Sequence, residues 1–373
     1  MIDAIRVLAP GIRARADAIE RARRLPPDVV RDLRAAGVFR LCVPRGLGGV
    51  EADPATLLAV LEELAWADGS TGWCAMIGAT SGLMSGYLPA DEARVIYGAS
   101  PDVVTGGVFA PVGRAVRENG HYRVTGRWRF ASGCQHSDWL MGGCLVHDGE
   151  VPRARLVFFP ASDVEVIDTW TVSGLCGTGS HDIAVHDLLV PVTRAVAPGD
   201  EPPVVDGALY AFPLFGLLAL GIAAVGLGIA RRARDEIVAL ASGKTPTGGR
   251  RTLAERSAVQ AQIAEAEATR ASAQAFLHEV VDAAWTEARA GGRIDVPARM
   301  RLRLAATHAT TAAARAVDAA YTLAGGTAIY ADHPLQRAFR DVHVVTQHMM
   351  VAQPTWELAG RLLLGLEADT SLL

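Results

Sequence analysis

The spacing of hydrophobic residues changes twice along this chain of 373 residues, and this change limits the folds open to it. Up to about Tyr97, apolar residues recur every three or four positions, which predicts helices. From Asp102 to Pro203, short β-branched and aromatic runs are separated by Gly and Pro, which predicts strands. From Ala211 onward, long Ala-, Leu-, Arg- and Glu-rich segments predict helices again, most clearly over 252–289 and 297–323.

Helices and strands in separate blocks predict an α+β fold that is mostly α, because βαβ units would alternate the two. We expect a helical region over 1–101, a β region over 102–203 and a helical bundle over 204–373. A Rossmann domain is not indicated, because its glycine fingerprint follows a strand. Gly226 and Gly228 lie inside an apolar helical run instead, and we assign them to helix packing.

The composition narrows the class of protein. Half of the residues are hydrophobic and a fifth are charged, which is typical of ordered soluble proteins. The net charge of −4 argues against nucleic acid or an anionic membrane as a partner. Lys244 is the only lysine, which excludes a P-loop. The five cysteines are scattered, with no C-x-x-C pair, so neither a disulfide framework nor a thiolate zinc site is expected. The N-terminus shows no apolar signal segment, so we expect a cytoplasmic protein.

One apolar segment has two interpretations. Residues 209–230 contain no charged side chain and are numerous enough to span a bilayer, and Arg231, Arg232 and Arg234 follow as a cytoplasmic flank would. The alternative is a helix buried on all sides in a bundle, where its glycines let neighbouring helices approach. We favour the buried helix, because the sequence offers no second span and amphipathic helices follow at once.

Four segments carry motifs in a recognisable order: a helix-to-turn segment over 37–50, a strand with Trp and Ser over 126–133, a strand pair over 170–191 and a bundle segment over 321–342. Together they resemble the acyl-CoA dehydrogenase superfamily. The resemblance implies an N-terminal helical domain, a central β-barrel-like domain and a C-terminal four-helix bundle.

The position of the dehydrogenation base separates the branches of this superfamily. In acyl-CoA dehydrogenases the base lies nine positions after the arginine of an R-D pair, here Arg340–Asp341, and that position is Met349. A thioether cannot serve as a general base. The other known base position, near Gly216, lies in the segment 209–230, which has no Asp or Glu. The pattern R-D-V-H-x-x-x-Q-H, which ends at His348, resembles instead the superfamily's flavin monooxygenases, such as 4-hydroxyphenylacetate and dibenzothiophene monooxygenases.

This second resemblance implies a function. The chain would be the oxygenase component of a two-component flavin-dependent monooxygenase, a homotetramer that receives reduced FMN or FAD from a separate NAD(P)H:flavin reductase. Oxygen would form a C4a-hydroperoxyflavin that hydroxylates an aromatic or heteroaromatic substrate, including polyketide- or indole-type compounds. Two alternatives stay open: an FAD-dependent acyl-CoA dehydrogenase with a relocated base, and a non-catalytic family member.

The resemblance also assigns roles to residues. Ser132 and His348 are the expected catalytic residues, near the flavin N5 and the peroxide; a turn-capping serine and a structural histidine are the competing interpretations. The remaining expectations are cofactor contacts at Trp128, Phe130, Ser132, Gly133, Gly325 and Gly326, and substrate contacts at Trp73, Ser81, His136 and Met349.

Three further points concern histidines. Many relatives in this branch have a substrate-binding histidine where this chain has Ser81, so a role in phenol deprotonation does not carry over. No metal site is expected, because His343 and His348 are five residues apart and diverge around a helix. His181 and His186, and His136 with Asp138, lack the nucleophile motif of a charge relay. We expect most of them at the surface or behind the site, with His136 as the one that lines it.

Overall fold

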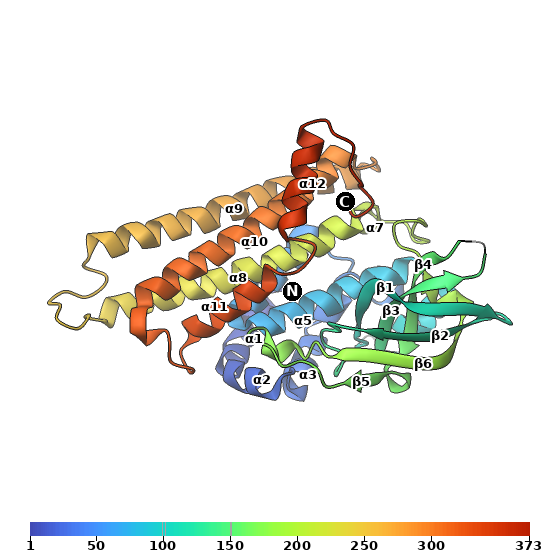
Figure 1. The fold of residues 1–373 in the computed structure, drawn as a ribbon, viewed down its shortest axis with the longest axis horizontal. Coiled ribbons are helices and arrows are strands. Elements are labelled where there is room, and N and C mark those ends of the chain that lie inside the picture. Colours follow the sequence, from blue (N-terminus) through green and yellow to red (C-terminus); the bar gives the residue numbers. More distant parts are fainter. Residues whose placement is uncertain (99, 101, 150) are drawn as a thin grey trace.

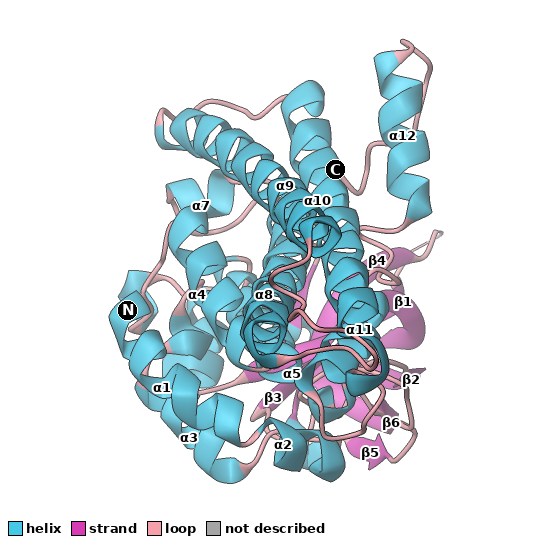
Figure 2. Cartoon of the chain, turned by 90° about the vertical axis from the view of Figure 1, so that its left-hand side faces the viewer, coloured by secondary structure: helices cyan, strands magenta, loops and turns pink. Residues whose placement is uncertain are grey.

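The computed structural model describes residues 1–98, 100, 102–149 and 151–373. Helices and strands occur in separate regions, as predicted: long helices form one part of the molecule and the sheet lies at the opposite end (Figure 1). The N-terminal helices pack below the long helices and reach the sheet through α5 (Figures 1 and 2). The α+β class, mostly helical, is therefore confirmed.

The N-terminal region owes two of its helix starts to aspartate caps. Asp53 accepts a hydrogen bond from Thr56 N at 2.8 Å, and Asp68 accepts one from Thr71 N at 2.7 Å, so each carboxylate satisfies a free backbone N–H of the first turn. The helices are α1 Ile2–Ala14, α2 Ala16–Ala22, α3 Pro27–Ala35, α4 Pro54–Ala67, α5 Gly69–Ser81 and α6 Ala90–Ala93.

The central region is a sheet of seven strands in the described residues, in the order β5-β6-β2-β1-β3-β4-β7. Only the β1–β3 pair is parallel among its ladders, and the others are antiparallel. The strands are β1 Thr105–Glu118, β2 His121–Trp128, β3 Trp139–His147, β4 Arg153–Pro160, β5 Glu165–Ile167, β6 Asp182–Pro191 and β7 Ala195–Val196. The predicted boundary between 203 and 204 lies in the connection from β7 to the next helix, which starts at Ala208.

The C-terminal region is built around α8. Residues 214–230 of the charge-free segment belong to this helix, and 78% of its most hydrophobic stretch is buried inside the protein. Gly228 shows why the packing needs glycine: a Cβ there would lie 2.4 Å from the carbonyl oxygen of Glu62 in α4. The segment is therefore the core helix of the bundle, as predicted. The helices are α7 Ala208–Ala211, α8 Leu214–Gly243, α9 Ser257–Arg289, α10 Val296–Ala324, α11 Pro334–Val345 and α12 Gln353–Leu363.

Candidate active site

Helix α5 meets the β region at a chain of hydrogen-bonded side chains. Trp73 Nε1 donates to Ser132 Oγ at 3.0 Å, and Ser132 Oγ lies 2.7 Å from Ser180 Oγ. Ser180 Oγ lies 2.7 Å from Thr178 Oγ1, which donates to the Leu175 carbonyl at 2.8 Å. All three hydroxyl-bearing residues are buried.

The groups at the two ends of this hydrogen-bonded series fix which atom donates in every bond between them. The Leu175 carbonyl can only accept, so the Thr178 hydroxyl donates to it and must accept from Ser180. Ser180 in turn accepts from Ser132, which accepts from the Trp73 indole. The proton of Ser132 is therefore already used within the protein, and it can be donated to a ligand only if the bond to Ser180 reverses.

His348 lies against the same tryptophan, with the two rings edge to face and their centroids 5.7 Å apart. Its Nδ1 accepts the backbone N–H of Met350 at 3.3 Å, so in the neutral ring the proton is on Nε2. Burial, with the positive charge of Arg303 as a smaller cause, lowers the pKa of His348 to about 4. Near neutral pH the residue is thus a fixed hydrogen-bond donor rather than a base.

His136 lies against Gly133, next to Ser132 in the chain, and is also neutral near pH 7. Its ring is 6.1 Å from Phe39, and burial, with Arg34 as a smaller cause, lowers its pKa to about 4. Gly133 is required here for two reasons: its φ is +73°, and a Cβ would lie 2.9 Å from His136 Nε2. The structure thus brings Trp73, Ser132, Gly133, His136 and His348 into one region.

These two histidines lead to a prediction for acid stability. Between about pH 6.5 and 4 the unfolded chain binds protons that the folded protein excludes, so folding stability falls as pH falls through this window. One pKa unit corresponds to about 1.4 kcal/mol, so each histidine costs about 3 kcal/mol at pH 4 relative to pH 7. We expect His136→Gln to gain this amount relative to the native sequence as the pH falls, measured by denaturant unfolding. His121→Gln, at an exposed position, is the control; equal pH dependence in both variants would contradict the prediction.

Trp128 and Phe130, both expected at the cofactor, lie in different environments. Trp128 is 0% exposed, donates its indole N–H to the Gly143 carbonyl at 2.7 Å and packs on Gly113, Gly126 and Gly142. Its side chain is part of the sheet's core, and we do not include it in the cofactor site. Phe130 is 61% exposed, with φ of +67°. Its ring is held edge to face at 6.2 Å from Trp170.

The other predicted residues are less closely grouped. Ser81 is buried at the end of α5, where its carbonyl accepts a hydrogen bond from Tyr97. Met349 is 64% exposed in the single chain, and its neighbour Met350 is buried. Gly325 and Gly326 are exposed before α11, at the opposite end of that helix from His348, and no other atom lies where their Cβ would be.

The other three histidines considered in the sequence have structural partners. His343 bonds Asp318 at 2.8 Å, and His186 lies beside Glu165 at the surface. His181 is buried, and its Nδ1 accepts from the N–H groups of Thr169 and Trp170. Within the described residues, no cluster of His, Cys, Asp or Glu has the arrangement of a metal site.

Sequence reasoning missed three residues that organise the site. Thr178 and Ser180 complete the hydroxyl chain, and their G-T-G-S sequence lies in 170–191, one of the four segments that carry the family resemblance. Asp341 is buried and accepts the Leu175 N–H at 2.6 Å, which ties α11 to the same loop. Burial raises the pKa of Asp341 to about 7.

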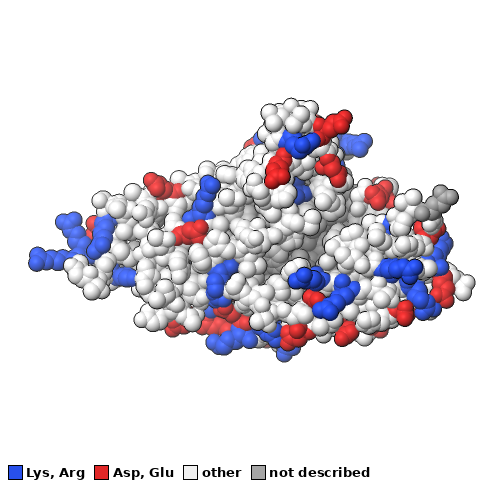
Figure 3. Space-filling model, viewed as in Figure 1, with Lys and Arg blue, Asp and Glu red and all other residues white. Residues whose placement is uncertain are grey.

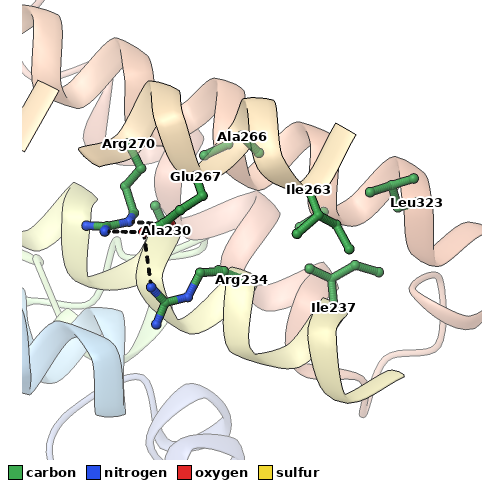
Figure 4. Close-up of a pocket in the computed structure, with 10 residues that line it drawn as sticks. Ala230, Arg234, Ile237, Ile263, Ala266, Glu267, Arg270 and Leu323 are labelled. Carbon is green, nitrogen blue, oxygen red and sulfur yellow. Dashed lines mark hydrogen bonds and ion pairs between the residues drawn. The ribbon is translucent and has the colours of Figure 1, made fainter. Parts of the chain in front are cut away.

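Two cavities elsewhere contain none of the predicted site residues. A cavity of about 380 Å³ lies between α1, α2, the end of α4, α8 and α11. A space of about 10 Å³ between α8, α9 and α10 is bordered by the ion pairs of Glu267 with Arg234 and Arg270 (Figure 4). This second space is no larger than one water molecule. The surface between the bundle and the sheet is hollowed below α12 (Figure 3), on the side where the loop after α11 meets the β region.

Comparison with known proteins identifies the class. The sequence matches the acyl-CoA dehydrogenase N-terminal domain over residues 4–89 and the acyl-CoA dehydrogenase C-terminal domain over 220–353. The 3-HSA hydroxylase from Rhodococcus sp. RHA1 has a crystal structure that matches with a TM-score of 0.93 and 27% identity, over 100% of this chain and 98% of its own. The chain therefore belongs to the acyl-CoA dehydrogenase superfamily and has its fold, as the motifs predicted.

Two sequence relatives define the branch. The indole-3-acetate monooxygenase of Pseudomonas putida is 36% identical over 97% of this chain and 93% of its own length. The oxygenase component of the FADH(2)-dependent resorcinol hydroxylase of Rhizobium sp. strain MTP-10005 is 31% identical, over 95% of this chain and 91% of its own. The protein is accordingly a flavin-dependent monooxygenase, the oxygenase component of a two-component system that uses reduced flavin and O2. The dehydrogenase and non-catalytic alternatives are set aside.

The region around Ser132 fits a flavin. An isoalloxazine ring needs aromatic faces together with hydrogen-bonding groups for its polar edge. Phe130 offers an exposed ring, and Ser132 and His348 offer a hydroxyl and an N–H group that are oriented by other bonds. No carboxylate occurs at Met349 or in the segment 209–230, so neither usual dehydrogenation base is present.

Proposed function

We propose that this enzyme hydroxylates an aromatic substrate of the indole type, with indole-3-acetate as the first compound to test. The observation that carries the proposal is the Trp73–Ser132–His348 arrangement, which has hydrogen-bond donors and aromatic surface but no carboxylate base. Two relatives, at 36% and 34% identity, are indole-3-acetate monooxygenases, which favours an indole over the resorcinol of a relative at 31% identity.

The bound reduced flavin supplies the activation of O2 and the transfer of one oxygen atom. We assign the rest to this chain: His348 donates its Nε2–H to the reacting oxygen, the Ser132 hydroxyl contacts the flavin edge, and Trp73 forms a wall of the site. Phe130 and Gly133 border the cofactor, and Ser81 and His136 border the substrate. For Met349, Gly325 and Gly326, contacts made by a neighbouring subunit are part of the proposal, because all three are exposed in the single chain.

We also propose a homotetramer in the cytoplasm, supplied by a separate NAD(P)H:flavin reductase. Exposed large apolar side chains are grouped near each other in the chain at two places among others, Ile329 and Tyr330 before α11, and Leu363, Leu364 and Leu366 at the end of α12. Exposed apolar residues grouped in this way are typical of subunit contacts. The five cysteines are all free, in keeping with a reducing compartment.

The function is tested with purified protein, chemically reduced FMN or FAD, O2 and indole-3-acetate. We expect a product whose mass exceeds that of the substrate by about 16 Da, the mass of one added oxygen atom, and little H2O2. Resorcinol and an acyl-CoA thioester are the comparison substrates. Product only from resorcinol would move the substrate class to phenols, and reduction of tightly bound FAD by the thioester would contradict the proposal.

The direction of the hydroxyl chain leads to a prediction for Ser180. In Ser180→Ala the proton of Ser132 is free for the flavin, and no internal hydrogen bond has to reverse on binding. With about 1 kcal/mol for one hydrogen bond, we expect reduced flavin to bind about fivefold more tightly, measured by equilibrium titration. Ser137→Ala, which removes a hydroxyl bonded to the Gly133 carbonyl, is the matched control. Weaker binding in Ser180→Ala would show that Ser180 itself supports the cofactor.

A further inference from the structure

Arg303 is a buried arginine that has no acidic partner among the ion pairs of the described residues. It lies on α10, is 4% exposed and donates from Nε to the Met350 carbonyl at 3.2 Å. Its other nitrogens donate to the Leu372 carbonyl and, at 3.4 Å, to Thr355 Oγ1. Burial lowers the pKa of Arg303 to about 10, so the group stays charged near neutral pH. A buried, unpaired cation is costly and needs a structural or functional reason.

The contacts of Arg303 all fall on the segment that carries His348 and on the segments that cover it. Met350 links the two residues directly, because its carbonyl accepts from Arg303 and its N–H donates to His348 Nδ1. Thr355 lies in the first turn of α12, and Leu372 lies in the segment after that helix. Figure 1 shows α12 and the C-terminus beside α10, where these contacts are made.

We propose that Arg303 is a positioning residue for the oxygenation reaction: by holding the Met350 carbonyl, it fixes the turn over 346–352 and, through the Met350 N–H, the ring orientation of His348. Its donors are taken up by carbonyl and hydroxyl groups of the chain, so it acts through Met350 and not by contact with the reacting atoms. This inference rests on the donor role proposed for His348.

The charge of Arg303 has a second effect on the same histidine. After burial itself, its positive charge is the cause that lowers the pKa of His348. Among the described residues, no carboxylate contributes to the shift of this pKa; the residue of α5 against the histidine ring is Trp73, and the residue of α12 bonded to Arg303 is Thr355. Arg303 therefore affects His348 in two ways that can be separated: its hydrogen bond to Met350 orients the ring, and its charge lowers the pKa.

Three substitutions separate them. Arg303→Met removes both contributions, Arg303→Gln keeps an N–H donor for the Met350 carbonyl without the charge, and Arg303→Lys keeps both in part. Arg301→Met, which removes an exposed ion pair with Glu279 from the same helix, is the matched control. The two readouts are the ratio of oxygenated product to H2O2, and the ring-nitrogen NMR shifts of His348 in the flavin-free protein across pH.

We expect Arg303→Met to lower the product ratio about tenfold or more, because small displacements of a catalytic group have large effects. In this variant His348 should no longer hold its proton on Nε2 alone, and its pKa should lie closer to the ordinary value for histidine. Arg303→Gln should keep the product ratio within about twofold of the parent protein while its His348 also titrates higher. Arg301→Met should change neither readout.

Two results would overturn the inference. The first is an unchanged product ratio together with unchanged His348 shifts in folded Arg303→Met. The second is a product ratio that falls as far in Arg303→Gln as in Arg303→Met, because this would assign the effect to charge alone. If Arg303→Met does not fold, Arg303→Gln and Arg303→Lys carry the test. If the parent protein oxygenates no aromatic substrate, the proposed function fails, and the NMR shifts still decide whether Arg303 orients His348.

Discussion

His348→Asn is expected to bind reduced flavin as the native sequence does but to release most of the consumed oxygen as H2O2. Asparagine can replace Nδ1 as the acceptor for the Met350 N–H, but it has no donor at the position of Nε2. The loss of one oriented donor at a reacting oxygen costs about a hundredfold in rate in other enzymes. We therefore expect formation of the oxygenated product to fall about a hundredfold, measured by product mass and H2O2 under single turnover.

Two further variants make this result specific. His348→Gln places an N–H group near the position of Nε2, so it should recover part of the product yield. His343→Asn changes a histidine of the same segment that is half-exposed and paired with Asp318, and it should behave like the native protein. Full coupling in His348→Asn would remove His348 from the reaction and leave it a structural residue.

Trp128→Phe is expected to lower the free energy of unfolding without weakening flavin binding. The substitution removes part of a fully buried ring that packs on three glycines, and it leaves the Gly143 carbonyl without its donor. A buried group without its hydrogen bond costs about 1–3 kcal/mol, and the cavity adds to this, so we expect a loss of about 3 kcal/mol in denaturant unfolding.

Phe130→Ala is expected to weaken flavin binding without lowering the free energy of unfolding, the opposite of Trp128→Phe. Phe130 is largely exposed, so its removal should change the unfolding free energy little while weakening flavin binding severalfold. If Trp128→Phe weakens flavin binding tenfold at unchanged stability, the indole contacts the cofactor and our placement of Trp128 in the core alone is wrong.

These two aromatic residues also show where sequence reasoning stops. The family resemblance assigned a cofactor role to both, and residues 128 and 130 would also share one face of a regular strand. β2 ends at Trp128, however, and Phe130 adopts a left-handed φ of +67°, so the alternation no longer applies. A left-handed non-glycine residue has no clear sequence signal, because nearby contacts stabilise it.

The class of fold and the buried α8 could be predicted, because each depends on a periodicity along the chain, and the grouping of Trp73, Ser132 and His348 was implied by the family resemblance. The hydrogen-bond direction at Ser132 could not, because it depends on the Leu175 carbonyl, far along the chain. Arg303 is one of many arginines in the sequence, and only the folded chain places it beside Met350. Contacts between residues far apart in the sequence set the hydrogen bonding and charge of the site, and local sequence patterns do not contain this information.

The peptide groups of Leu175 join helix α11 to the loop between β5 and β6. Its N–H is held by Asp341 of α11, and its carbonyl accepts from Thr178 and from the Trp170 indole. Separation of the bundle from the β loop would break the first of these bonds and leave the amide open to solvent. The Leu175 amide is outside any regular helix or strand, where exchange with deuterium is ordinarily fast. The exchange rate of this amide would therefore report how often the contact between α11 and the β loop opens in the resting enzyme, without any substrate.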